Sequence, residues 1–188
     1  MADNKPMSCE SAISVIKRTG LLMSNLALVY YFEYVITTGL PVAIAGQIKQ
    51  MHPKNEKGFV LTNAFIIFNF CYQIGVFISR SSLSILKIER VWIVTTLQFL
   101  NFLFWFSNSF HMYVTSIYVY FVHMVFVGLM GGASFVNVIY QLKNSQKLQK
   151  TEKELAMNLL SMFDDLGILS AAITALILTL TAFKQYEK

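Results

Sequence analysis

Three carboxylates lie inside long apolar runs of the sequence: Glu33, Asp164 and Asp165. A charged side chain at the centre of a membrane helix costs about 2.5 to 3.5 kcal/mol on insertion scales, so such residues mark candidate sites for protons or solutes. Glu33 precedes Gly39 and Pro41, where a helix kink could leave backbone carbonyls available. The sequence predicts that Glu33 either lines a polar cavity or pairs with a neighbouring helix.

The two aspartates are adjacent, and adjacent positions on a helix point about 100° apart, so both cannot face one cavity squarely. Helical spacing places them on different faces. One face is polar and comprises Asn158, Ser161 and Asp165. The other surrounds Asp164 with small or apolar residues: Leu160, Gly167 and Ala171. This spacing predicts that Asp165 lines a cavity and that Asp164 is a buried partner at a close helix contact.

A second apolar run carries Asn69, Gln73 and Arg80 on one helical face, with Arg80 at the predicted membrane boundary. A guanidinium group in this position could hold an anionic group through two parallel hydrogen bonds. The alternative is that Arg80 extends toward lipid headgroups, as arginines near helix ends commonly do. The sequence is compatible with both interpretations.

A fourth apolar run carries a polar stripe that includes His123, Ser134 and Asn137. His123 could relay protons, because a small change of environment moves its pKa across physiological pH. The alternative is a histidine that is hydrogen-bonded for structural reasons. Small residues also predict close helix packing in two runs, and they are Gly128, Gly131, Gly132 and Gly167.

These residues must be positioned by helices that cross a bilayer. The chain is 55% hydrophobic and 13% charged, whereas soluble domains carry about 25% charged residues, which excludes most soluble folds. A membrane helix needs about 20 apolar residues. Five stretches qualify and run from Leu21 to Ala45, Phe59 to Ser79, Val91 to Ser107, Tyr113 to Tyr140 and Leu155 to Phe183. Strand-length alternation is absent, so we predict an all-α integral membrane protein with five transmembrane helices.

The predicted organisation has three parts. Residues 1–20 form a polar tail, in which Ser8 to Arg18 is either an interfacial helix or a disordered lead-in. Residues 21–183 form the five-span transmembrane domain, and residues 184–188 form a short C-terminal tail. The polar links between spans, such as 46–58 and 108–112, are too short to be separate domains.

The net charge of +5 is explained by topology. With five spans, ten Lys and Arg residues fall on the side of the N-terminus and five on the other side. The positive-inside rule then predicts a cytosolic N-terminus and a luminal C-terminus. The basic surplus is expected to interact with anionic lipid headgroups, and no nucleic-acid partner is predicted.

Sequence motifs for catalysis are absent. The chain has no phosphate-binding glycine loop, zinc-protease pair or nucleophile elbow. Its two cysteines, Cys9 and Cys71, have no disulfide or metal-site spacing. We therefore expect a protein that is not an enzyme and that has no metal or other cofactor.

Five segments of the chain match a known family in order and spacing. They are YYFEYVITTGL, CYQIGVFISRSSL, LQFLNFLF, GLMGGASFVN and AMNLLSMFDDLG. From about Leu21 to Ala182 the chain resembles the battenin (ceroid lipofuscinosis neuronal protein) family, and specifically its C-terminal half. The resemblance implies the C-terminal half of a fold related to major facilitator and equilibrative nucleoside transporters. It also implies a late endosomal, lysosomal or vacuolar membrane.

The resemblance further implies efflux of glycerophosphodiesters or related small polar solutes, with links to luminal pH and basic amino acid homeostasis. By position, Glu33, Arg80 and Asp164 match the acidic and basic residues of family motifs, so the family favours Asp164 where spacing favours Asp165. Val127 stands where the family usually has an acidic residue, and the C-terminus lacks the prenylation cysteine of some relatives.

Two hypotheses follow. In the first, the chain is a transporter module with a pathway along Glu33, Arg80, Asn137 and Asp164 or Asp165, and it needs an N-terminal half, a partner polypeptide or a homo-oligomer because such sites lie between two halves. In the second, it is a non-transporting membrane subunit or scaffold that retains the fold.

Overall fold

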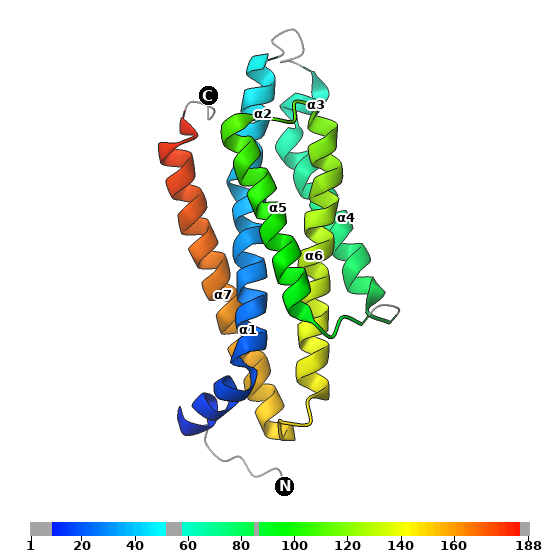
Figure 1. Cartoon of the computed structure of the whole chain (residues 1–188), viewed down its shortest axis with the longest axis vertical. Coiled ribbons are helices and arrows are strands. Elements are labelled where there is room, and N and C mark those ends of the chain that lie inside the picture. Colours follow the sequence, from blue (N-terminus) through cyan, green and yellow to red (C-terminus); the bar gives the residue numbers. More distant parts are fainter. Residues whose placement is uncertain (1–8, 52–57, 85–86, 185–188) are drawn as a thin grey trace.

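The computed structural model describes residues 9–51, 58–84 and 87–184, and every regular element in these ranges is helical. Figure 1 shows the long helices running side by side along one axis, with the first helix beginning at one end and the last helix ending at the other. The elements are α1 (Cys9–Thr38), α2 (Leu40–Met51), α3 (Phe59–Thr62), α4 (Ala64–Ser81), the 3-10 turn η2 (Ser82–Ser84), α5 (Val91–His111), α6 (Ile117–Asn144) and α7 (Lys150–Thr181). The all-helical prediction is therefore confirmed for the described residues.

Helix α1 is the central element of the bundle. It packs against α7, α5 and α6, while α4 packs mainly along α6. α2 continues the line of α1, and the two are separated only at Gly39, whose N–H still donates to the Val35 carbonyl oxygen at 3.1 Å. Pro41 falls in the first turn of α2, a position that tolerates proline because the first N–H groups of a helix have no partner within that helix. α1 and α2 thus follow one another with only Gly39 between them.

Four helical segments are long and apolar enough to cross a membrane, namely Glu10–Met51, Ala64–Ser81, Ile117–Asn144 and Lys150–Thr181. The predicted count of five spans is not confirmed, because α5 is absent from this set although it has 21 residues. Its inner face carries buried polar side chains, including Gln98, Asn101 and Asn108, which lower its hydropathy. α5 nevertheless runs through the bundle beside α1 and α6 (Figure 1).

The helices extend beyond three of the predicted segment boundaries. The helix of the first span begins at Cys9 without interruption at residue 20, although its first turns lie across the bundle axis (Figure 1). The link predicted from residue 46 is helical to Met51, and the link predicted from residue 108 is helical to His111. Hydrogen bonding continues the helices past the end of each apolar run. Residues 1–8 and 185–188 of the predicted tails lie outside the described residues.

The buried apolar residues form two clusters at different levels of the bundle. One cluster contains Phe68, Trp105 and Tyr120, and on α1 and α2 its residues begin at Ile36. The other cluster lies toward the start of α1, and its residues on that helix extend to Tyr30. Glu33 lies between these two levels, so the helices position a polar group where neither apolar cluster fills the interior.

Candidate functional site

The carboxyl group of Glu33 is enclosed by three helices. Its side chain is 1% exposed, and its Oε1 accepts a hydrogen bond from the Tyr72 hydroxyl of α4. On the other side it lies against Gly131 of α6, in the space that a Cβ atom at this glycine would need. Glu33 Oε2 has no hydrogen-bond partner among the described residues. The Tyr72 hydroxyl is therefore the side-chain donor that holds the buried Glu33 carboxyl group within the bundle.

Gly131 and its neighbouring glycines have different roles, although the sequence assigned all of them to helix packing. Gly131 makes room for a side chain, the Glu33 carboxyl group. Gly128 and Gly132 instead face the backbone and Ser79 of α4, and a Cβ atom at either would collide with them. These contacts bring α4 close to α6, and the same approach brings the Tyr72 hydroxyl to Glu33.

Two residues of this arrangement were missed by the sequence analysis. Tyr72 was overlooked because an aromatic residue in an apolar run is usually part of the lipid-facing surface or the core. Gly75 was overlooked because it stands alone in α4, yet a Cβ atom there would strike the Val125 carbonyl oxygen of α6. Tyr72 and Gly75 are three residues apart, so they lie on the same side of α4, the side that faces α6. Helical periodicity could therefore have identified this pair.

Arg80 lies at the end of α4 with an exposed side chain. Its Cζ atom is 4.6 Å from the ring centroid of Phe135 of α6, a cation–π contact. The ring centroids of Phe135 and Tyr30 are 6.3 Å apart. Tyr30 is 8% exposed and lies on α1, three residues before Glu33. Aromatic rings therefore connect the exposed arginine with the level of the buried carboxylates.

The structure separates the two aspartates. Asp164 is 8% exposed, and its Oδ1 atom has no hydrogen-bond partner among the described residues. One turn later, Gly167 approaches the Ala27 carbonyl oxygen of α1 so closely that a Cβ atom would not fit. Asp165 is exposed on the outer face of α7, together with Asn158 and Ser161. Asp164 therefore lies on the α1-facing side, and Asp165 does not lie with Glu33.

The polar stripe predicted for the fourth span has its side-chain partners mainly on α5 and in the segment before it. His123 Nδ1 accepts a hydrogen bond from Trp105 Nε1 of α5 at 2.8 Å. Asn137 donates to the Ala133 carbonyl oxygen at 2.8 Å and accepts from the Ile88 N–H at 2.7 Å, which ties the segment before α5 to α6. Ser134 is fully buried, and its hydroxyl has no partner among the described residues.

Asn69 and Gln73 lie on α4, and neither forms a hydrogen bond with Glu33 in the described part of the chain. Asn69 Nδ2 donates to the Phe65 carbonyl oxygen of its own helix at 2.9 Å. Gln73 is exposed on the outer face of the helix. Of the predicted pathway residues, Arg80 is connected to the level of Glu33 through Phe135 and Tyr30. Asp164 is buried on the side of α7 that faces α1.

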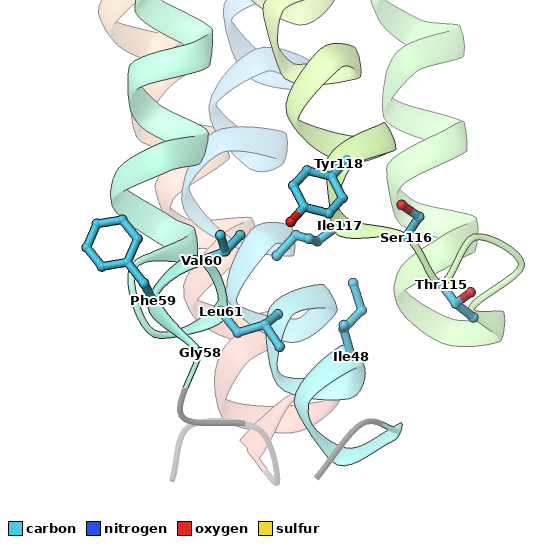
Figure 2. A pocket seen from close by; sticks show the side chains of 9 residues that line it. All are labelled: Ile48, Gly58, Phe59, Val60, Leu61, Thr115, Ser116, Ile117 and Tyr118. Atoms are coloured by element: carbon cyan, nitrogen blue, oxygen red, sulfur yellow. The ribbon is translucent and has the colours of Figure 1, made fainter. Parts of the chain in front are cut away.

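An apolar pocket of about 320 Å³ lies between α2, α3 and the start of α6, at the end of the bundle where α2 ends. Figure 2 shows Ile48, Leu61 and Ile117 pointing toward one another, whereas Phe59 points away. The lining contains no charged side chain, so it offers no charged group that would bind an ionic solute. In the described part of the chain, no group of three or more His, Cys, Asp or Glu side chains could hold a metal ion.

We predict that Tyr72→Phe lowers stability, because it leaves Glu33 Oε1 buried without its donor. The expected loss is about 1 to 3 kcal/mol in the free energy of unfolding, the usual effect of leaving a buried polar group unpaired. Thermal unfolding of the purified chain in one detergent would measure it. Tyr118→Phe is the matched control, since Tyr118 is 65% exposed, and equal midpoints for the two variants would contradict the prediction.

Comparison with known proteins gives a consistent result. The family model described as CLN3 protein matches residues 3–183. The chain is similar to battenin of Dictyostelium discoideum, with 41% identity over 154 residues that cover 82% of this chain. It is also similar to Protein BTN1 of Eremothecium gossypii, with 31% identity and 83% coverage, and to battenin of Canis lupus familiaris, with 31% identity and 90% coverage.

The chain spans only 35% to 37% of the length of these three relatives. No solved structure was found to match it.

Proposed function

Because the chain belongs to the CLN3 protein family, we propose that it forms one wall of a solute pathway through a membrane and that Glu33 carries the coupled proton. Family membership implies a membrane protein of the lysosome or vacuole, in a family generally regarded as one of transport or trafficking and not of catalysis. The match spans about a third of the length of these relatives, so the remaining walls would come from an N-terminal half, a partner polypeptide or a second copy.

One observation supports the proposal above all others: the Glu33 carboxyl group is buried between the Tyr72 hydroxyl and Gly131. An ionised carboxylate inside a membrane is costly unless it is well paired, so such residues are typical of proton relays and ion pathways. Glu33 has one donor and one unpaired oxygen. A group of this kind can exchange a proton when the surrounding helices separate and admit water.

The proposed solute is a glycerophosphodiester or a related small polar molecule, and its export would influence luminal pH and basic amino acid levels. Arg80 is the group suited to such a solute, because a guanidinium binds phosphate oxygens in a bidentate manner. Its contact with Phe135 holds the guanidinium near the bundle while leaving it exposed. The cytosolic N-terminus and luminal C-terminus stay predictions from the distribution of basic residues.

We expect Arg80→Gln to reduce solute export about 10- to 100-fold, because it removes charged hydrogen bonds worth roughly 1.5 to 3 kcal/mol. The measurement uses the Dictyostelium battenin with its matching segment replaced by this chain, and follows a radiolabelled glycerophosphodiester out of acidic vesicles. Arg80→Lys keeps the charge but lacks the planar guanidinium group that makes two parallel hydrogen bonds, so it should give an intermediate loss of export. Lys184→Gln, at the other end of the bundle, is the control for net charge.

Full export by a stable, correctly targeted Arg80→Gln protein would refute the role of this arginine. If Glu33→Gln also exported normally, the proposed mechanism would be wrong, because export would need neither residue. A stable, correctly targeted chimera that exports no solute even without substitutions would favour the second hypothesis, a non-transporting membrane subunit or scaffold in which the buried carboxyl groups stabilise helix contacts.

A further inference from the structure

A large cleft lies at the end of the bundle where α1 begins, the lower end in Figure 1. Its volume is about 980 Å³, and it is formed by α1, the first residues of α5, and the last turns of α6 with the turn that follows. Glu33, Tyr72 and Gly131 do not line it. The cleft is therefore separate from the site discussed above and does not depend on the function proposed for that site.

Hydrogen bonds connect the walls of this cleft. Arg18 of α1 donates to the Lys147 carbonyl oxygen at 2.6 Å and forms an ion pair with Glu152 at the start of α7. Gln141 of α6 donates to the Glu89 carbonyl oxygen at 2.9 Å, just before α5. These contacts join all the elements around the cleft, so its shape is set by specific bonds. The pairing with Glu152 largely neutralises Arg18.

The remaining charges give the rim of the cleft a positive character. Arg90 and Lys147 line the cleft with exposed side chains, and Glu89 opposes one of these charges. Lys87 adds a further cation, because its Nζ lies 5.0 Å from the ring centroid of Tyr140, another lining residue. Three cations thus stand against one carboxylate at the rim, a balance that favours an anionic ligand.

The interior of the cleft is apolar, which distinguishes it from a site for a free solute. Val91 and Leu142 are buried, at 3% and 1% exposed, and line its floor together with Leu22. Leu21 and Trp92 line the same cleft and are 84% and 57% exposed. Tryptophan and tyrosine at the end of a membrane helix are typical of the headgroup level of a bilayer. The cleft therefore combines a cationic rim with an apolar surface that acyl chains could cover.

We propose that this cleft binds an anionic phospholipid from the adjoining leaflet, with the phosphate near Arg90 and Lys147 and an acyl chain along Leu21 and Trp92. Basic residues next to membrane helices recognise anionic headgroups through charge. The amphipathic lining selects a lipid over a water-soluble phosphodiester, because only the lipid would cover the apolar part. Binding at this position would hold α1, α5 and α6 together at one membrane face.

The test is thermal unfolding of the full chain in a neutral detergent with three added probes. They are dioctanoyl phosphatidylglycerol, dioctanoyl phosphatidylcholine and glycerophosphoglycerol, the soluble counterpart of the first headgroup. At 100 times the dissociation constant, phosphatidylglycerol should raise the unfolding midpoint by roughly 5 to 10 °C. The double substitution Arg90→Gln with Lys147→Gln should remove this rise. Lys49→Gln with Lys184→Gln removes two charges elsewhere and should retain it.

Equal rises with phosphatidylcholine would refute charge recognition. A rise with glycerophosphoglycerol that equals the rise with phosphatidylglycerol and is lost in the Arg90 and Lys147 double variant would identify a solute site in this cleft and overturn the lipid assignment. A rise that persists in the Arg90 and Lys147 double variant would show that the lipid binds elsewhere. Circular dichroism of each variant would verify helix content, and because Arg90 and Lys147 are exposed, their replacement should leave it unchanged.

Discussion

Replacing Glu33 with glutamine should make solute export independent of the pH difference across the membrane. If one proton moves with each solute, one pH unit is worth 1.36 kcal/mol and changes the steady-state distribution of solute about tenfold. Glutamine keeps the size of the side chain and can still accept the Tyr72 hydrogen bond, but it cannot carry a proton at any accessible pH. We therefore expect folded protein that has lost this tenfold dependence.

The measurement is solute distribution in vesicles that contain the Dictyostelium chimera, at several fixed luminal pH values. Glu154→Gln is a matched control, since it removes an exposed carboxylate near the start of α7. A Glu33→Gln chimera that keeps the pH dependence of the unmodified chimera would exclude Glu33 as the proton carrier. In that event Asp164, the other buried carboxyl group of the described residues, would be the next residue to test.

Gly128→Ala is expected to be strongly destabilising, although alanine is the better helix former. A Cβ atom at this position would overlap the Tyr72 carbonyl oxygen and approach the Val76 nitrogen of α4 to 3.0 Å. Backbone atoms cannot rotate away, so α4 and α6 must separate at a cost of about 1 to 3 kcal/mol or more. Separation would also move the Tyr72 hydroxyl away from Glu33, and solute export should fall with stability.

Gly20→Ala is the matched control for Gly128→Ala. A Cβ atom there would lie 3.4 Å from the Ile16 side chain, an ordinary contact within α1. We expect a gain of up to about 1 kcal/mol from helix propensity alone. Unfolding midpoints of the two variants should therefore shift in opposite directions. Equal gains for both would show that the α4 and α6 contact is looser than the structure indicates.

Local patterns in the sequence predicted several features of this bundle. Long apolar runs predicted its helices, because helix formation in lipid depends mainly on length and hydropathy. Spacing of three and four predicted that Asp164 and Gly167 share a buried face, which the structure places against α1. Polar residues on the inner face of α5, such as Gln98, are the reason that the span count was not confirmed, because hydropathy does not distinguish an inward face from an outward one.

The sequence by itself determined that this chain is a helical membrane protein of one family with a carboxylate in mid-span, because hydropathy, helical period and family motifs are properties of consecutive residues. Only the tertiary structure decided that Tyr72 is the partner of Glu33 and that Gly131 makes room for its carboxyl group. It likewise decided that Asp165 lies on the outer face of α7. Partners on different helices depend on how far each helix is rotated and shifted along its neighbour, and close backbone contacts at glycines such as Gly75 and Gly128 set that register.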